Sequence, residues 1–131
     1  MDKCKEAADL LMNCLGEGNT IMQLPDTLIP STLKEAYTVQ AYIETSNNPR
    51  VGWKLAATSA AGQKHIGVSG PLVGRITSKM SLNLGQFATT KANNMMVAEP
   101  EFVFVLNRRI EPRDRSYTKE EAIGLVSELK L

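Results

Sequence analysis

The chain has 131 residues, and its 15 basic and 14 acidic side chains leave a formal net charge of +1. Because acids and bases are interspersed, we expect neither nucleic acid nor an anionic membrane as a partner. The length suits one domain, and no apolar run is long enough to span a bilayer.

Residues 1–49 are predicted to form a helical N-terminal region. Apolar spacing predicts a first helix from Lys3 to Leu15, which Gly16 and Gly18 end. After a loop, Ser31 is predicted to cap a second helix that runs to about Thr45.

Both cysteines fall in the first predicted helix. Cys4 and Cys14 lie too far apart along a straight helix to form a disulfide. The first residues also lack the apolar core of a signal peptide. We therefore expect reduced thiols in a cytoplasmic protein.

Residues 51–57 read as the first strand. One face of it carries the larger apolar side chains, and Lys54 stands on the other face between Gly52 and Ala56. These small neighbours leave room for a ligand beside the lysine. The alternative is an exposed lysine on an edge strand, a common protection against aggregation.

The next forty residues carry weaker signals. A short helical turn is predicted over 59–66, a tight segment over 67–74, a short strand at Arg75-Ile76, and mostly loop over 77–94. The glycines of the tight segment match neither phosphate-binding motif, G-x-x-x-x-G-K-[ST] or G-x-G-x-x-G. His65 is the single histidine, and no carboxylate is placed by sequence to orient it, so we expect a surface or structural role.

Residues 96–106 predict the central strand, with apolar side chains on both faces and burial on both sides. Glu99 and Glu101 would then share one buried face, where like charges repel and desolvation is costly. A bound divalent cation would make the pair tolerable. The alternative is that both glutamates mark a solvent-facing start of the strand.

The remainder predicts a turn at 107–109 and a last helix. Thr118 and Glu121 match a capping box, and the helix is expected to continue to about Leu131. Its predicted inner face consists of Ala122, Ile123, Val126 and Leu129.

Four blocks together resemble the 2-oxopent-4-enoate hydratase group of the fumarylacetoacetate hydrolase superfamily. They are residues 36–40 (AYTVQ), 51–59 (VGWKLAATS), 66–74 (IGVSGPLVG) and 97–106 (VAEPEFVFVL). The resemblance covers nearly all of the chain, which spans about the first half of a typical member. It implies an α+β fold, in which the helical region of residues 1–49 packs on an incomplete, mostly β core. Residues 50–131 hold the start of that core and a terminal helix.

The resemblance also implies a site. The family binds Mg²⁺ or Mn²⁺ through glutamates at the positions of Glu99 and Glu101, and a lysine at the position of Lys54 contacts the substrate. Lys54 would pair with the substrate carboxylate or move a proton. Ser69 is a further implied substrate contact, in a block where the family usually has an acidic residue. The family's third acidic ligand follows the last helix, so no residue of this chain is assigned to it.

The implied function is a metal-dependent lyase that adds water to 2-hydroxypenta-2,4-dienoate-type acids in aromatic-compound catabolism, giving 4-hydroxy-2-oxo acids. Two alternatives use the same site, namely decarboxylation of an oxalocrotonate-like acid and hydrolysis of an acylpyruvate. A third is a truncated, non-catalytic relative that acts as an assembly module. Because a half-built sheet exposes strand edges, we expect a homo-oligomer.

Overall fold

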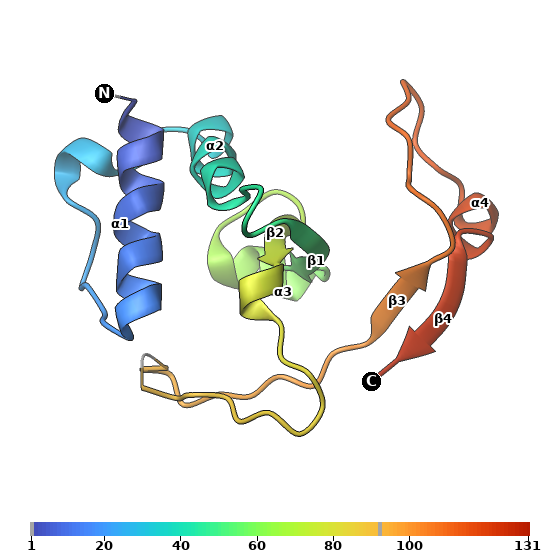
Figure 1. Cartoon of the computed structure of the whole chain (residues 1–131). Helices are drawn as coiled ribbons and strands as arrows, with labels where there is room; N and C mark the ends of the chain where they lie inside the picture. Colours follow the sequence, from blue (N-terminus) through green and yellow to red (C-terminus); the bar gives the residue numbers. More distant parts are fainter. Residues whose placement is uncertain (1, 92) are drawn as a thin grey trace. The chain divides into compact units, whose positions relative to one another are not determined.

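The computed structural model describes residues 2–91 and 93–131 (Figure 1). The chain divides into two compact units, residues 1–94 and residues 95–131. Each unit combines helix with one small antiparallel sheet, which confirms the α+β class. The fuller fumarylacetoacetate-hydrolase-like core and the single domain divided after residue 49 stay predictions. In the stretches described, no helix has the length and apolar character needed to cross a membrane.

The first unit begins with two capped helices. Helix α1 (Lys3–Glu17) starts where the Asp2 carboxylate accepts from the Cys4 N–H at 2.9 Å, and it ends at Gly18 with φ +65°. It therefore runs through Gly16, the first of its two predicted stop residues. Helix α2 (Leu33–Ile43) is capped by Thr32 instead of the predicted Ser31, because the Thr32 hydroxyl accepts from the Glu35 N–H at 3.1 Å.

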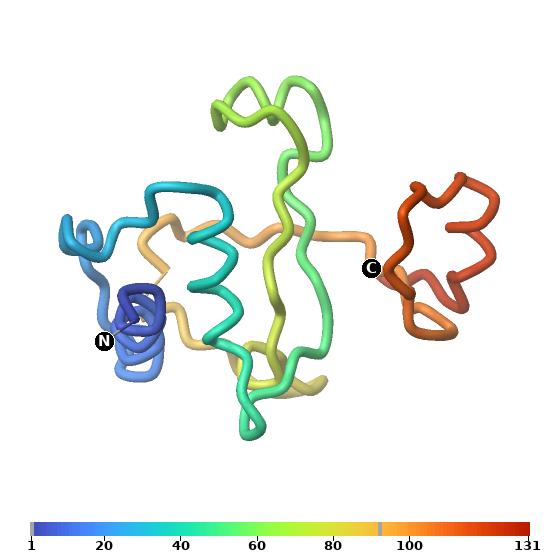
Figure 2. The backbone as a smooth tube through the Cα atoms, turned by 90° about the horizontal axis from the view of Figure 1, so that it is seen from above, coloured from blue at the N-terminus to red at the C-terminus, as the bar shows by residue number. Residues whose placement is uncertain are grey.

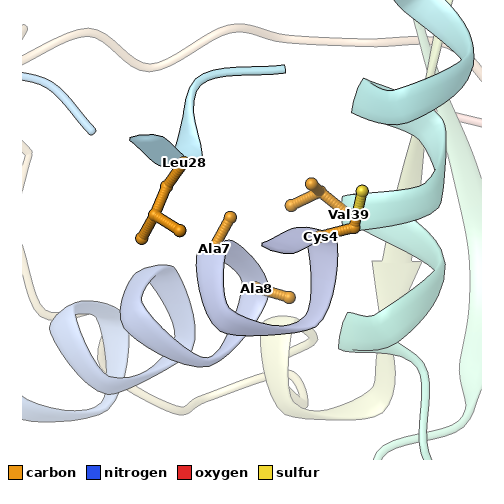
Figure 3. Close-up of a cluster of buried hydrophobic side chains, with 5 residues drawn as sticks. All are labelled: Cys4, Ala7, Ala8, Leu28 and Val39. Atoms are coloured by element: carbon orange, nitrogen blue, oxygen red, sulfur yellow. The ribbon is translucent and has the colours of Figure 1, made fainter. Parts of the chain in front are cut away.

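A small apolar core lies between these helices. Helix α1 contributes Cys4, Ala7 and Ala8, while Leu28 comes from the short 3-10 helix η1 (Asp26–Leu28) and Val39 from α2. Figure 3 shows Leu28 and Val39 reaching toward α1. The core is built around two alanines, whose short side chains let its elements approach closely. Both cysteines of α1 are free thiols, as predicted.

A two-stranded sheet completes the first unit. Strand β1 (Arg50–Ala56) pairs antiparallel with β2 (Leu72–Thr77), with Lys54 opposite Gly74. Strand β2 is longer than the predicted Arg75-Ile76 pair and takes in the end of the predicted tight segment. Helix α3 (Ala60–Ile66), which Ser59 caps, connects the two strands and confirms the helical turn predicted over 59–66. The short helix η2 (Ser78–Met80) follows β2. Figure 2 shows α2, β2 and β1 side by side in that order.

The central strand predicted over residues 96–106 is wrong in its first part. Strand β3 covers only Val103–Leu106, and residues 96–102 are irregular and exposed. Met96 has φ +51°, outside the strand region, and Pro100 has no N–H to donate to a ladder. Burial on both sides is also wrong, because the side chains of Val103 and Phe104 are 51% and 62% exposed.

The predicted last helix is wrong in its second half. The capping box is confirmed, since the Thr118 side chain accepts from the Glu121 N–H and the Glu121 side chain from the Thr118 N–H. Helix α4, however, spans only Lys119–Ile123. The chain then forms β4 (Val126–Lys130), antiparallel to β3, so that Leu129 lies opposite Phe104 and Val126 opposite Leu106. Cross-strand apolar pairs of this kind favour the sheet over a longer helix.

Candidate functional site

Lys54 lies in the middle of β1, and its side chain is half-buried. Small residues flank it along β1, as the sequence suggests, while Leu72 and Ile76 lie beside its cross-strand partner on β2. Gly52 and Ala56 flank it on the same face of the strand, and Gly74 is its cross-strand partner. A β-carbon added at Gly74 would lie 3.7 Å from the Lys54 β-carbon. Glycine at this register therefore leaves space beside the lysine side chain.

Ser69 lies in the same unit, on the exposed turn between α3 and β2. The turn begins at Gly67, whose φ of +79° belongs to the left-handed region, and it leads into the strand that carries Gly74. His65 lies one turn earlier, exposed in the last turn of α3. Its exposure agrees with the predicted surface role.

Glu99 and Glu101 belong to the second unit, in the irregular segment that precedes β3. Both residues are exposed, and both make interactions within the structure. The argument that two buried carboxylates need a cation therefore does not apply. A solvent-facing pair before the strand, the alternative from the sequence, agrees with this exposure.

Glu99 and Glu101 can be compared with the ligands that the implied metal ion needs. Carboxylate oxygens are the ligands that Mg²⁺ and Mn²⁺ prefer. Nowhere among residues 2–91 and 93–131 do three or more His, Cys, Asp or Glu side chains gather in a way that could hold a metal ion. Two glutamates therefore fit such an ion in kind but do not complete its site, and we derive no chemical step through it.

An ionic cluster around Glu121 in the second unit was not predicted. The Glu121 carboxylate binds the guanidinium of Arg113, and it also accepts from Arg115 at 2.8 Å. The Arg113 guanidinium lies 3.5 Å from the centre of the Tyr117 ring. The Arg113 hydrogen bonds, then the Thr118 N–H and Arg115, lower the pKa of Glu121 to about 2. A carboxylate this fully engaged ties the 107–118 loop to α4 and is unsuited to proton transfer.

We predict that Glu121→Gln makes the second unit less stable at neutral pH and insensitive to mild acid. A lowered carboxyl pKa stabilises the fold fully above its unfolded value of about 4.5, and that stabilisation is lost as the pH falls toward about 2. Circular dichroism between pH 7 and pH 2 checks this window. Glu120→Gln is the matched control, because Glu120 makes no ion pair in the described residues. Equal acid profiles for wild type and Glu121→Gln would contradict the prediction.

The second unit also contains an apolar hollow of about 360 Å³, formed by side chains of β3, α4, β4 and the loop before α4. Its lining includes Phe104, Leu106, Tyr117, Ile123 and Val126. It contains none of the residues that the sequence predicts for catalysis or metal binding. We therefore assign the hollow no part in the implied reaction.

A second unpredicted cluster surrounds Trp53. The guanidinium carbons of Arg50 and Arg75 lie 4.3 and 5.1 Å from its ring centre, and both arginines pair with Glu44, at 3.2 and 2.6 Å. Arg75 lies 31 residues from Glu44 in the chain, and no local pattern in the sequence predicts that contact.

Comparison with protein-family models, with curated proteins and with solved structures found no match to this chain.

Proposed function

We propose that the chain is a hydratase-like lyase that acts on 2-hydroxypenta-2,4-dienoate-type acids, as in aromatic-compound catabolism. The observation that carries the proposal is the block around Lys54. The resemblance places a substrate-contacting lysine at this position, and the structure holds Lys54 half-buried in β1 between Gly52 and Ala56, opposite Gly74. A single cationic side chain among small residues suits a small carboxylate ligand.

In this proposal the substrate dienol first becomes a ketone, and water then adds to the conjugated double bond. The Lys54 ammonium would attract the substrate carboxylate, or it would move the proton during ketonisation. Ser69 would contribute a hydroxyl from the turn before β2. Decarboxylation of an oxalocrotonate-like acid and hydrolysis of an acylpyruvate would use the same lysine, and they differ in the product released.

The proposal includes Mg²⁺ or Mn²⁺ as cofactor, with Glu99 and Glu101 as two of its ligands. The described residues bring no third His, Cys, Asp or Glu side chain together with two others, so the proposal names only these two protein ligands. Calorimetric titration of Mg²⁺ into wild type and Glu101→Ala measures this directly. We expect a heat of binding that is lost in the variant, and equal heats would remove Glu101 from the site.

The activity itself is tested by the loss of dienol absorbance when purified protein and Mg²⁺ are added. We expect the absorbance to fall and a 4-hydroxy-2-oxo acid to accumulate. Release of carbon dioxide from an oxalocrotonate-type acid would favour the decarboxylase, and acid release from an acylpyruvate would favour the hydrolase. Absence of turnover on all three substrates, with both metals, would reject the enzymatic proposal.

A second candidate is a non-catalytic assembly module. It is favoured by the exposed apolar side chains of Val51, Trp53 and Leu55 along one strand of the sheet. Under this proposal the protein is inert toward all three substrates but associates with another chain. The two candidates are therefore separated by the activity assay together with a measurement of association.

A further inference from the structure

The two edges of the β1–β2 sheet differ. The outer edge of β2 is covered by α2, because the Val73 N–H donates to the Tyr37 hydroxyl and the Arg75 N–H to the Gln40 side-chain oxygen, each at 3.2 Å. Figure 2 shows α2 beside β2, with β1 on the side away from the helix. Side chains of α2 thus accept hydrogen bonds from main-chain N–H groups of β2 that would otherwise be available to another strand.

The outer edge of β1 is open. In an antiparallel pair, residues alternate between pointing their main-chain groups toward the partner strand and away from it. Val73 and Arg75 point theirs toward α2, so their cross-strand partners Leu55 and Trp53 point theirs away from β2. Among the described residues, no hydrogen bond engages the outward main-chain groups of Trp53 or Leu55.

The side chains along this edge are apolar and exposed. Val51, Trp53 and Leu55 are 59%, 49% and 54% exposed, and they share one face of β1. The Trp53 ring is held in place by Arg50 and Arg75, whose charges are partly balanced by Glu44. The pairing of β1 with β2 is irregular between Arg50 and Gly52 and regular from Gly52 to Ala56. An apolar edge with unpaired main-chain groups, as in this regular part, is a template for another strand.

We propose that the outer edge of β1 pairs with the same edge of a second copy, antiparallel about a two-fold axis at Trp53. Trp53 then faces Trp53 of the second copy, and Leu55 lies beside the irregular Val51 end of that copy's strand. Gly52 faces Lys54 of the second copy, so the two lysines are not directly opposite one another. A register centred on Lys54 would oppose like charges, which disfavours pairing.

A second copy fits this edge because the pairing closes. Each two-stranded sheet is marginal alone, and the dimer joins two of them into one sheet of four strands. Helix α2 blocks the outer edge of β2 in both copies, so the sheet cannot grow further. Closed two-fold pairing is the commonest form of homo-oligomer. Because the contact is limited to one short strand from each copy, we expect a small interface, below about 1,200 Å², and reversible association.

Sedimentation equilibrium of the full chain over a range of concentrations tests this pairing. We expect wild type to move from monomer to dimer and Leu55→Lys to remain monomeric, because a lysine on the edge opposes strand addition. Ile66→Lys is the matched control, since Ile66 is 52% exposed in the same unit but lies in α3. It should dimerise like wild type. A monomeric wild type at all concentrations would overturn the proposal. The remaining partner for this edge would then be a strand of a different protein.

The register is tested separately by Trp53→Cys in a chain whose Cys4 and Cys14 are replaced by serine. Directly opposed residues of a hydrogen-bonded pair have α-carbons about 5.5 Å apart, which a disulfide can span. Mild oxidation should therefore give a disulfide-linked dimer. Ile66→Cys in the same background should stay monomeric under denaturing conditions. Circular dichroism confirms that each variant folds, and a folded Trp53→Cys chain that dimerises without cross-linking would overturn the register.

Discussion

Replacing Leu28 by alanine is expected to lower the free energy of unfolding of the first unit by about 2–4 kcal/mol. The Leu28 side chain is 7% exposed and packs in the small core with Ala7, Ala8 and Val39. The surrounding alanines have no side-chain length with which to fill the space left behind. Both the lost transfer energy and the cavity therefore contribute to the loss.

Urea unfolding followed by tryptophan fluorescence measures this effect, because the single tryptophan, Trp53, lies in the same unit. Ile29→Ala is the matched control, since Ile29 is the next residue and is 43% exposed. We expect it to cost less than about 1 kcal/mol. If both variants lost the same stability, Leu28 would not be the anchor of the core that its burial indicates.

The elements that depend on local signals were predictable. Helices begin where a side chain accepts a main-chain N–H a few residues later, so Asp2, Thr32 and Thr118 each set a start within a residue or two of the expectation. Strand β1 likewise begins one residue before its predicted start. In these segments, the signals of neighbouring residues agree with the conformation that the fold requires.

The predictions were wrong in segments whose conformation depends on pairing with a strand distant in the sequence. Residues 122–129 have the apolar spacing of a helix, yet Val126–Lys130 pairs with β3 instead. Nothing in the local pattern identifies Phe104 and Leu106 as the partners of Leu129 and Val126. The same holds for the arginine pairs of Glu121 and Glu44, since sequence indicates charge but not which charges meet.

The site residues that the resemblance implies stay predictions, and the structure shows which of their expected surroundings were correct. Gly52 and Ala56 do flank Lys54 on one face of β1, as the alternation of a strand predicts. The predicted burial of Glu99 and Glu101 depended on a continuous strand, and the positive φ of Met96 and the missing N–H of Pro100 prevent one there. The local backbone therefore decides how exposed the two glutamates are, and the resemblance does not predict that exposure.

Lys54→Met is expected to lower kcat/KM for the proposed dienol substrate by about 100-fold or more, with a thermal stability close to that of wild type. Methionine keeps the length and apolar stem of lysine, and it removes the charge and the proton. Lys64→Met is the matched control, because Lys64 is exposed in the last turn of α3 in the same unit. Its activity should equal that of wild type.

Lys54→Arg separates the two roles proposed for the lysine. Arginine keeps the positive charge but stays protonated at neutral pH. If Lys54 binds the substrate carboxylate, the arginine variant should retain much of kcat with a changed KM. If Lys54 transfers a proton, kcat should fall as far as it does in Lys54→Met. Steady-state kinetics of the three proteins at one metal concentration make the comparison. Full activity in Lys54→Met would remove the lysine from the mechanism, and with it the observation on which the proposed function rests.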